Sequence, residues 1–282
     1  MRRRRLAAEL QRLRTASRRT LEEVADYLEC SPAKISRIEN GQVTVRIQDA
    51  RDLLDLYSVE GDRREVLLQM VRQSRSKGWW SPYADLLDEG AQTLLSLEDE
   101  ASAILIYETN LVTALLQTRS YAWEMLSAWH DVRLDLVQRK VELKMARQQI
   151  LTRTDGPPRL DVVLDESSLR RTVGTPDVMS EQYLRLVAAA DQANVTLRVL
   201  PFEAGSHQAM GFPFQIFEFA GDDPHIVFVE LLSGSECFES AEEVGRYRAA
   251  FNQVSDRALD PARSRRFIEL LAASAGRMPR SS

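Results

Sequence analysis

The stretch from Thr20 to Gly41, TLEEVADYLECSPAKISRIENG, constrains the fold most, because its caps and spacing predict two short helices joined by a tight turn. Thr20 is a suitable N-cap for the first helix, and Glu23, three residues later, completes a capping box. Ser31 is a second N-cap, and Pro32 occupies the first helical position, where its missing N–H costs nothing. Gly41 is placed to end the second helix in a left-handed conformation.

The second of these helices has two different faces. Ile35 and Ile38 lie three residues apart, so both point into the same core. The opposite face is small at its start and basic in its middle, which suits a helix that enters the DNA major groove with its N-terminal end. The alternative is an ordinary helical hairpin whose basic residues are solvated. Together with the two residues that begin the helix, this face comprises Ser31, Pro32, Ala33, Lys34, Ser36, Arg37 and Asn40.

Within this face we expect Ala33, Lys34 and Arg37 to reach base edges. Arg37 is the strongest candidate, because its planar guanidinium can donate two hydrogen bonds to O6 and N7 of guanine. Pro32 and Ala33 have no polar side-chain atoms and suit contact with a thymine methyl group. The polar side chains better placed for phosphates are those of Ser31, Ser36 and Asn40.

The run LEEVADYLECSPAKISRIENG resembles the motif of the Xre, or phage-repressor-like, helix-turn-helix regulators, in which an ending of the form Ile-Ser-Arg-Ile-Glu-x-Gly is common. This resemblance implies binding to double-stranded DNA. Family members usually carry a DNA-contacting Gln at the position that Leu21 occupies here, so the phosphate contacts of this chain are expected to differ.

The later motifs Gly78-Trp79-Trp80 and Leu115-Leu116-Gln117-Thr118 resemble the actinobacterial subgroup of these regulators that carries a large C-terminal domain of unknown role. The subgroup includes WhiJ-like and antitoxin-like proteins. The resemblance implies a small partner protein encoded nearby. Where the subgroup commonly has Pro-Gly, this chain has Thr113-Ala114, which predicts a less tight turn.

The charge of the 282-residue chain is unevenly distributed. The net charge is −5, but residues 1–80 contain 17 Lys and Arg against 12 Asp and Glu, a net of +5, which leaves −10 for the remainder. A basic module attracts phosphates, whereas an acidic one is repelled from DNA. The charge therefore supports DNA binding by the N-terminal part independently of the motif.

Composition predicts a cytoplasmic protein with two packed domains. The hydrophobic content of 44% is enough for real cores, and we find no apolar run long enough to cross a membrane. MRRRR is not followed by the apolar core of a signal peptide. Cys30 and Cys237 are too few for a metal site, so we expect no metal and no cofactor.

The first predicted domain, residues 1–77, is an all-α, five-helix domain. Its first helix is expected from Leu6 to Ala16, and two apolar-periodic segments follow the helix-turn-helix. Arg2 to Arg5 form a basic arm, either a solvated terminus or a contact to phosphates or the minor groove.

The second predicted domain, residues 78–282, is α+β: mainly helical over 88–153, then a small mixed sheet within 159–282 with helices on one face. A helix is expected from Asp131 to Arg153, and another with Ser180 as its cap. FPFQIFEF alternates like a half-buried strand, and Ile104–Tyr107 is either a buried strand or a helix end. Ser240 with Glu243 and Asp260 with Arg263 mark the last two helices.

A ligand site in the second domain is a weaker prediction. Carboxylates that end β-rich runs, together with aromatic side chains and a polar loop, would suit a cationic or hydroxylated ligand. The adjacent tryptophans are alternatively an interdomain plug, and the loop with His207 a plain connection. The candidate ligand-binding residues are Trp79, Trp80, Tyr107, Glu166, His207 and Glu230.

The sequence predicts a DNA-binding transcription regulator rather than an enzyme, since it contains no catalytic motif that we recognise. The second domain is expected to bind a small-molecule or protein effector, and a homodimer would place two recognition helices about 34 Å apart on a palindrome. The alternative is a metal-dependent, nuclease-like enzyme tethered to DNA that uses Asp161, Asp165 and Glu166. The operator, the effector and the direction of regulation are not encoded in these patterns.

Overall fold

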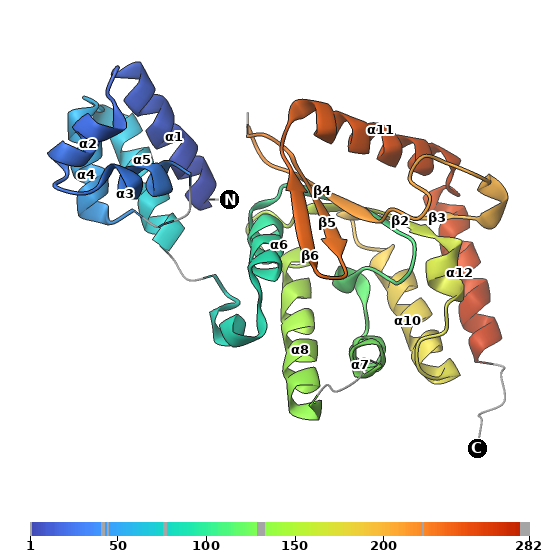
Figure 1. The fold of residues 1–282 in the computed structure, drawn as a ribbon. Coiled ribbons are helices and arrows are strands. Elements are labelled where there is room, and N and C mark those ends of the chain that lie inside the picture. The colour runs from blue at the N-terminus through green and yellow to red at the C-terminus, as the bar shows by residue number, and fades with distance from the viewer. Residues whose placement is uncertain are drawn as a thin grey trace. The chain divides into compact units, whose positions relative to one another are not determined.

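The structure is a computed structural model that describes residues 2–40, 43, 45–75, 78–128, 133–221 and 223–276, with backbone alone at 2–5 and 73–75 (Figure 1). The chain divides into two units, Met1–Ser81 and Pro82–Ser282. Each unit has its own core and is described by itself.

The first unit is helical, as predicted. Leu10, Ile35, Leu53 and Leu54 are among the fully buried side chains of its core cluster. The backbone is helical from Arg2, so the stretch predicted to be an arm belongs to the first helix, although its side chains lie outside the described ones. The helices are α1 (Arg2–Ala16), α2 (Leu21–Tyr27), α3 (Pro32–Glu39), α4 (Ile47–Leu56) and α5 (Gly61–Arg75).

The caps of the helix-turn-helix form as predicted. The Thr20 hydroxyl accepts a hydrogen bond from the Glu23 N–H, and the Glu23 carboxylate accepts one from the Thr20 N–H. Ser31 caps α3 by accepting from the Lys34 N–H, and Pro32 is the first helical residue. The predicted C-terminal residue of this helix, Gly41, lies outside the described residues.

The second unit contains a mixed sheet of six strands, which confirms the α+β class. The strand order is β3-β2-β1-β4-β5-β6; the first three strands are parallel to one another and the remaining pairs are antiparallel. The strands are β1 (Ala103–Glu108), β2 (Arg159–Asp165), β3 (Val195–Leu200), β4 (Phe214–Glu218), β5 (Ile226–Leu231) and β6 (Gly234–Phe238).

Helices and short 3-10 turns precede, connect and follow these strands. The α-helices are α6 (Glu89–Glu100), α7 (Arg119–Ser127), α8 (Leu134–Arg147), α9 (Glu166–Arg170), α10 (Pro176–Ala189), α11 (Ala241–Arg257) and α12 (Pro261–Ala275). The 3-10 turns are η1 (Ser81–Leu86), η2 (Ala114–Leu116), η3 (Gln148–Leu151) and η4 (Phe202–Ala204).

Helices cover both faces of the sheet, so the prediction of one covered face is wrong. Phe251 and Val254 of α11 pack with Leu105, Tyr107 and Ile216 on one face. Figure 1 shows α6, α8, α10 and α12 on the opposite side. The reason is that the central strands are apolar on both sides, including β4, which was predicted to be half-buried but is buried on both faces.

Three further boundaries differ from the predictions. Strand β1 lies within the segment 88–153 that was predicted to be mainly helical, and it is central in the sheet. The described part of the helix predicted from Asp131 is shorter, ending at Arg147 before a 3-10 turn. Helix α10 begins at Pro176 with Thr175 as its cap, because a Thr-Pro pair is a better start signal than Ser180 alone. Ser240 and Asp260 cap α11 and α12 as expected.

Candidate nucleic-acid interface

Helix α3 presents the predicted face to solvent. Ile35 and Ile38 are buried in the core of the first unit, while Ala33 and Arg37 are exposed. Two charged residues of the helix are nevertheless restrained by the protein itself. These contacts decide which side chains are free to meet a nucleic acid.

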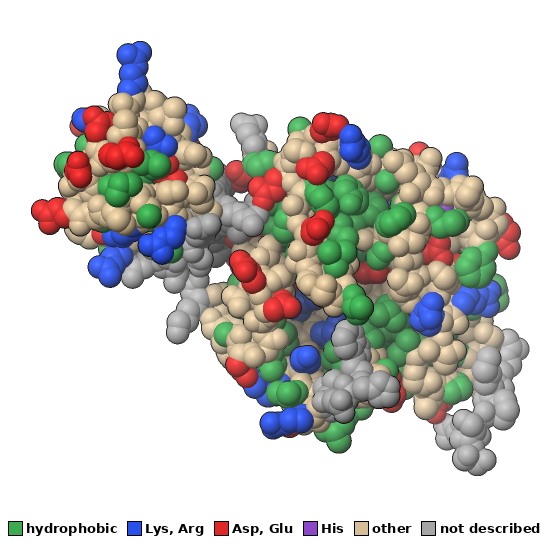
Figure 2. Space-filling view, in the orientation of Figure 1, with side chains coloured by type: hydrophobic (Ala, Val, Ile, Leu, Met, Phe, Trp, Pro, Cys, Tyr) green, Lys and Arg blue, Asp and Glu red, His purple; other side chains and the backbone are tan. Residues whose placement is uncertain are grey.

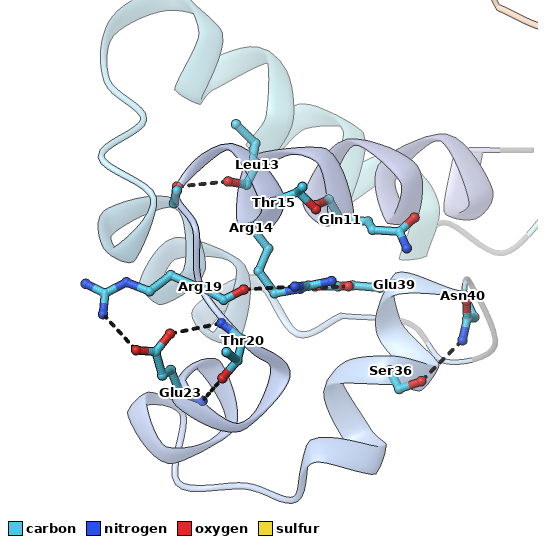
Figure 3. Close-up of polar contacts among 11 residues, drawn as sticks. Gln11, Leu13, Arg14, Thr15, Arg19, Thr20, Glu23, Ser36, Glu39 and Asn40 are labelled. Carbon is cyan, nitrogen blue, oxygen red and sulfur yellow. Dashed lines mark hydrogen bonds and ion pairs between the residues drawn. The ribbon is translucent and has the colours of Figure 1, made fainter.

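A buried ion pair fixes the orientation of α3. The Arg14 Nε on α1 donates to both carboxylate oxygens of Glu39 at 2.8 and 3.0 Å, and the two side chains are only 16% and 4% exposed. Arg14 also donates to the Arg19 carbonyl oxygen, and Figure 3 shows its guanidinium between these two acceptors. The hydrogen bond with Glu39 raises the pKa of Arg14 further, so Arg14 stays protonated. Turning α3 about its axis would separate a buried charge from its partner.

Lys34 is held by an intramolecular ion pair that the sequence did not reveal. Its ammonium donates to the Asp49 carboxylate of α4 at 2.8 Å. The side chains are 35% and 18% exposed, so this is a partly screened contact of the kind that contributes about 1 kcal/mol or less. Lys34 must therefore leave Asp49, or share its charge with it, before it contacts a base.

Arg37 is the predicted base-reading residue that remains available. Its Nε lies 3.4 Å from the Ala33 carbonyl oxygen, a long hydrogen bond within the helix, and among the described residues no carboxylate lies within ion-pair distance. Asn40 donates to the Ser36 hydroxyl at 3.3 Å, so these two polar side chains lie together on the exposed side of the helix (Figure 3). Ser31 and Pro32 are exposed at the N-terminal end.

The residues predicted to share a ligand site in the second unit do not lie together. The Tyr107 hydroxyl lies 3.3 Å from Nε2 of His207 on the α11 side of the sheet, where burial lowers the pKa of His207. Glu166 is engaged locally, because it accepts from the Phe202 N–H and the Arg170 Nε. Glu230 interacts electrostatically with residues of α6 and α8, which cover the other face.

Trp79 and Trp80 belong to the first unit. Their rings make an edge-to-face contact with centroids 5.7 Å apart, and both side chains are partly exposed. The Nε1–H of Trp79 is buried without a hydrogen-bond partner among the described residues.

The acidic residues of the alternative enzyme hypothesis are engaged separately. Asp161 pairs with Arg198 at 2.7 Å, and Asp165 caps α9 by accepting from the Ser167 N–H. No group of three or more metal-ligating side chains that could hold an ion occurs among the described residues.

Sequence reasoning missed four charged residues on the sheet face opposite α11: Glu98, Glu108, Lys144 and Arg147. The Arg147 guanidinium donates to both oxygens of Glu98 at 2.6 Å. The one signal available in the sequence was a charged residue at the end of the apolar run Ile104–Tyr107, since a strand buried on both faces rarely carries a charge without a reason.

This fold and the exposed face of α3 define a helix-turn-helix protein with a second, α+β unit. A family model described as a helix-turn-helix domain matches residues 5–67. A second model, described as a domain of unknown function (DUF5753), matches residues 91–270, and the chain belongs to this family. Comparisons with curated proteins and with solved structures found no match. Across the described residues, no helix combines the length and the apolar character that a membrane span needs.

Proposed function

We propose that this protein is a sequence-specific transcription regulator in which α3 reads an operator and the second unit binds an effector that controls this reading. The observation that carries the proposal is the exposed Arg37 on a helix whose opposite face is fixed in the core. The helix-turn-helix match and the positive charge of residues 1–80 support it. The negative charge of the remainder suits a module that does not itself contact DNA.

The proposal includes a homodimer and a partner protein. One short recognition helix touches few base pairs, and two copies about one helical turn apart would read a palindromic site. The resemblance to WhiJ-like and antitoxin-like regulators supports a small partner protein encoded nearby. We further propose that the second unit senses rather than catalyses. Experiments are needed to identify the operator and the effector and to distinguish repression from activation.

The experiment begins with footprinting of the promoter of the protein's own gene, with and without the small protein encoded nearby. Binding of wild type, Arg37→Ala and Arg72→Ala to the protected site is then measured by fluorescence anisotropy. Arg72 is an exposed residue of α5 and serves as the matched control for loss of one positive charge.

We expect Arg37→Ala to lose about 1–3 kcal/mol of binding free energy and to stop discriminating at one base pair of each half-site. Arg72→Ala should retain this discrimination. Equal affinity and equal base preference for wild type and the Arg37 variant would refute the assignment of Arg37. A chain that binds no DNA at low salt would refute the regulator proposal itself.

A further inference from the structure

A cluster of charged side chains lies on the sheet face opposite α11 in the second unit. It is built from strands β1 and β5 and from helices α6 and α8, and the amide side chain of β4 lies beside it. We call this the charged cluster; its members are Glu98, Glu108, Lys144, Arg147, Gln215 and Glu230.

The strand register places three oxygen-bearing side chains on one face. Gln215 is paired with Ile106 on one side and with Phe228 on the other. Glu108 and Glu230 each lie two residues beyond these partners, so their side chains share the face of Gln215. Neighbouring strands are about 4.8 Å apart, which brings three such side chains within reach of one small molecule.

Helix α8 supplies two cations above this face. Lys144 and Arg147 are three residues apart and therefore neighbours on the helix surface. Arg147 is committed to Glu98, which is 1% exposed and accepts both of its hydrogen bonds. Lys144 is the cation of the cluster that is left without such a partner.

The remaining members of the charged cluster are unpaired. Among the described residues, the side chains of Glu108, Glu230 and Lys144 have no hydrogen bond and no ion pair within 4.0 Å, although their backbones belong to β1, β5 and α8. Gln215 is 6% exposed, and its Oε1 is buried without a donor. An unsatisfied buried polar atom costs about 1–3 kcal/mol, so proteins seldom retain one without a use.

The electrostatics of the charged cluster agree with this geometry. Burial, followed by repulsion from Glu230, raises the pKa of Glu108 to about 8. Burial, followed by repulsion from Arg147, lowers the pKa of Lys144 to about 8. Figure 2 shows Lys and Arg side chains in a hollow between the β5–β6 hairpin and α8. Glu108 and Lys144 are partly exposed and Glu230 is exposed, so a solute can approach them.

We propose that the charged cluster binds a small zwitterion of the amino-acid type. Its ammonium group donates to Glu108, Glu230 and the Gln215 Oε1, and its carboxylate accepts from Lys144. The three hydrogen-bond acceptors on the sheet, Glu108, Glu230 and Gln215, are suited to bind an N–H donor. Lys144 on α8 is suited to bind an anionic group beside it. A divalent metal ion fits worse, because two cationic side chains already lie in the cluster. This inference rests on the proposed function, in which the second unit binds an effector.

The test uses the full chain and the twenty proteinogenic L-amino acids as probes, with thermal unfolding as the first readout and calorimetric titration as the second. For each amino acid that raises the melting temperature, its Nα-acetyl derivative and its decarboxylated amine are titrated as well. We expect at least one free amino acid to bind, its acetylated form to fail, and the amine to bind at least tenfold more weakly.

Three variants locate the site. Glu108→Gln and Glu230→Gln should each weaken the binding of that amino acid at least tenfold, whereas Glu181→Gln, on an exposed position of α10, should leave it unchanged. Should Glu108→Gln fail to fold, Glu230→Gln carries the test, because Glu230 is exposed and its replacement spares the core.

The inference would be overturned if none of the twenty amino acids stabilised the protein. Equal binding of an amino acid by wild type and both cluster variants would overturn it as well. Measuring DNA binding by the same protein preparations distinguishes failure of the zwitterion site from failure of the regulator proposal. Intact DNA binding without amino-acid binding overturns only the zwitterion site. Amino-acid binding in a chain that recognises no DNA overturns the regulator proposal and leaves the site standing.

Discussion

Each unit of this protein contains a buried Arg–Glu pair with two charge-assisted hydrogen bonds, and the two pairs have different surroundings. Arg14 and Glu39 join α1 to α3, and the further acceptor of Arg14 is the Arg19 carbonyl oxygen. Arg147 and Glu98 join α8 to α6, and the carboxylates of Glu108 and Glu230 also act on Arg147. Among the described residues, no further ionised side chain is paired with the first pair, which we therefore call a closed pair. The second pair lies beside three charged side chains that have no partner of their own in the described part of the chain.

The comparison distinguishes two roles for buried charged residues: fixing the packing of two helices, and forming part of a ligand site as proposed for the charged cluster. A closed pair specifies one packing of two helices and offers nothing to a solute. Additional carboxylates around a buried pair destabilise the folded state through desolvation and mutual repulsion, and the pair itself does not offset this free energy. The surroundings of a buried ion pair, rather than the pair itself, therefore indicate whether it belongs to a site.

Glu39→Ala should have the largest effect on local stability. It leaves the Arg14 guanidinium largely buried with no carboxylate to pair with, which costs about 3–5 kcal/mol. Hydrogen exchange in peptides from α1 and α3, followed by mass spectrometry, measures this loss in the first unit alone. Arg12→Ala, which removes an exposed partner of Glu9, is the control and should change protection little. Unchanged protection in the Glu39 variant would mean that the pair does not fix α3.

Glu98→Ala should cost less, about 1–3 kcal/mol, although Glu98 is more deeply buried than Glu39. The reason is that Arg147 can turn to the neighbouring Glu108 or Glu230, a choice that Arg14 lacks. Exchange in peptides from α8 and β1 reports this change. A loss equal to or greater than that in the Glu39 variant would contradict the distinction between the two pairs.

The third prediction is a dependence of stability on pH that is carried by Glu108. Its pKa is raised from 4.5 to about 8 in the folded protein, so the folded state holds a proton that the unfolded chain releases. Its contribution to stability is complete below pH 4.5 and is lost as the pH rises through about 8. Lys144, whose pKa is lowered from 10.5 to about 8, contributes in the opposite direction above that range.

The comparison of wild type with Glu108→Gln isolates the first contribution. We expect the melting temperature of the variant, measured relative to that of wild type, to rise between pH 5 and pH 8. A constant difference in melting temperature across this range would show that Glu108 is ionised in the folded protein throughout. Another group would then have to offset the negative charge of the buried carboxylate.

The helix-turn-helix was predictable because its signals are local. Thr20 with Glu23 and Ser31 with Pro32 are caps that act within one turn of the chain, so they form whatever the rest of the protein does. The contact between Lys34 and Asp49 was not predictable, since it depends on how two different helices, α3 and α4, pack against each other.

The charged cluster was not predictable from the sequence, because it is formed by contacts between residues that lie far apart in the chain. Glu108 and Glu230 come together only because β4 lies between β1 and β5, an order that apolar periodicity does not encode. Tyr107 and His207 were chosen for the same site as Glu230, but strand alternation sends Tyr107 to the α11 side. Glu166 ended a β-rich run as expected, yet the Phe202 N–H and Arg170 occupy its carboxylate.

Strand β1 holds Tyr107 and Glu108 as consecutive residues in the middle of the sheet, one under α11 and the other under α8. A ligand bound at Glu108 in the proposed site would therefore lie one residue along the chain from the Tyr107 ring, which makes an edge-to-face contact with His207. A single peptide unit thus joins the proposed site on one face of the sheet to the aromatic contact on the other face.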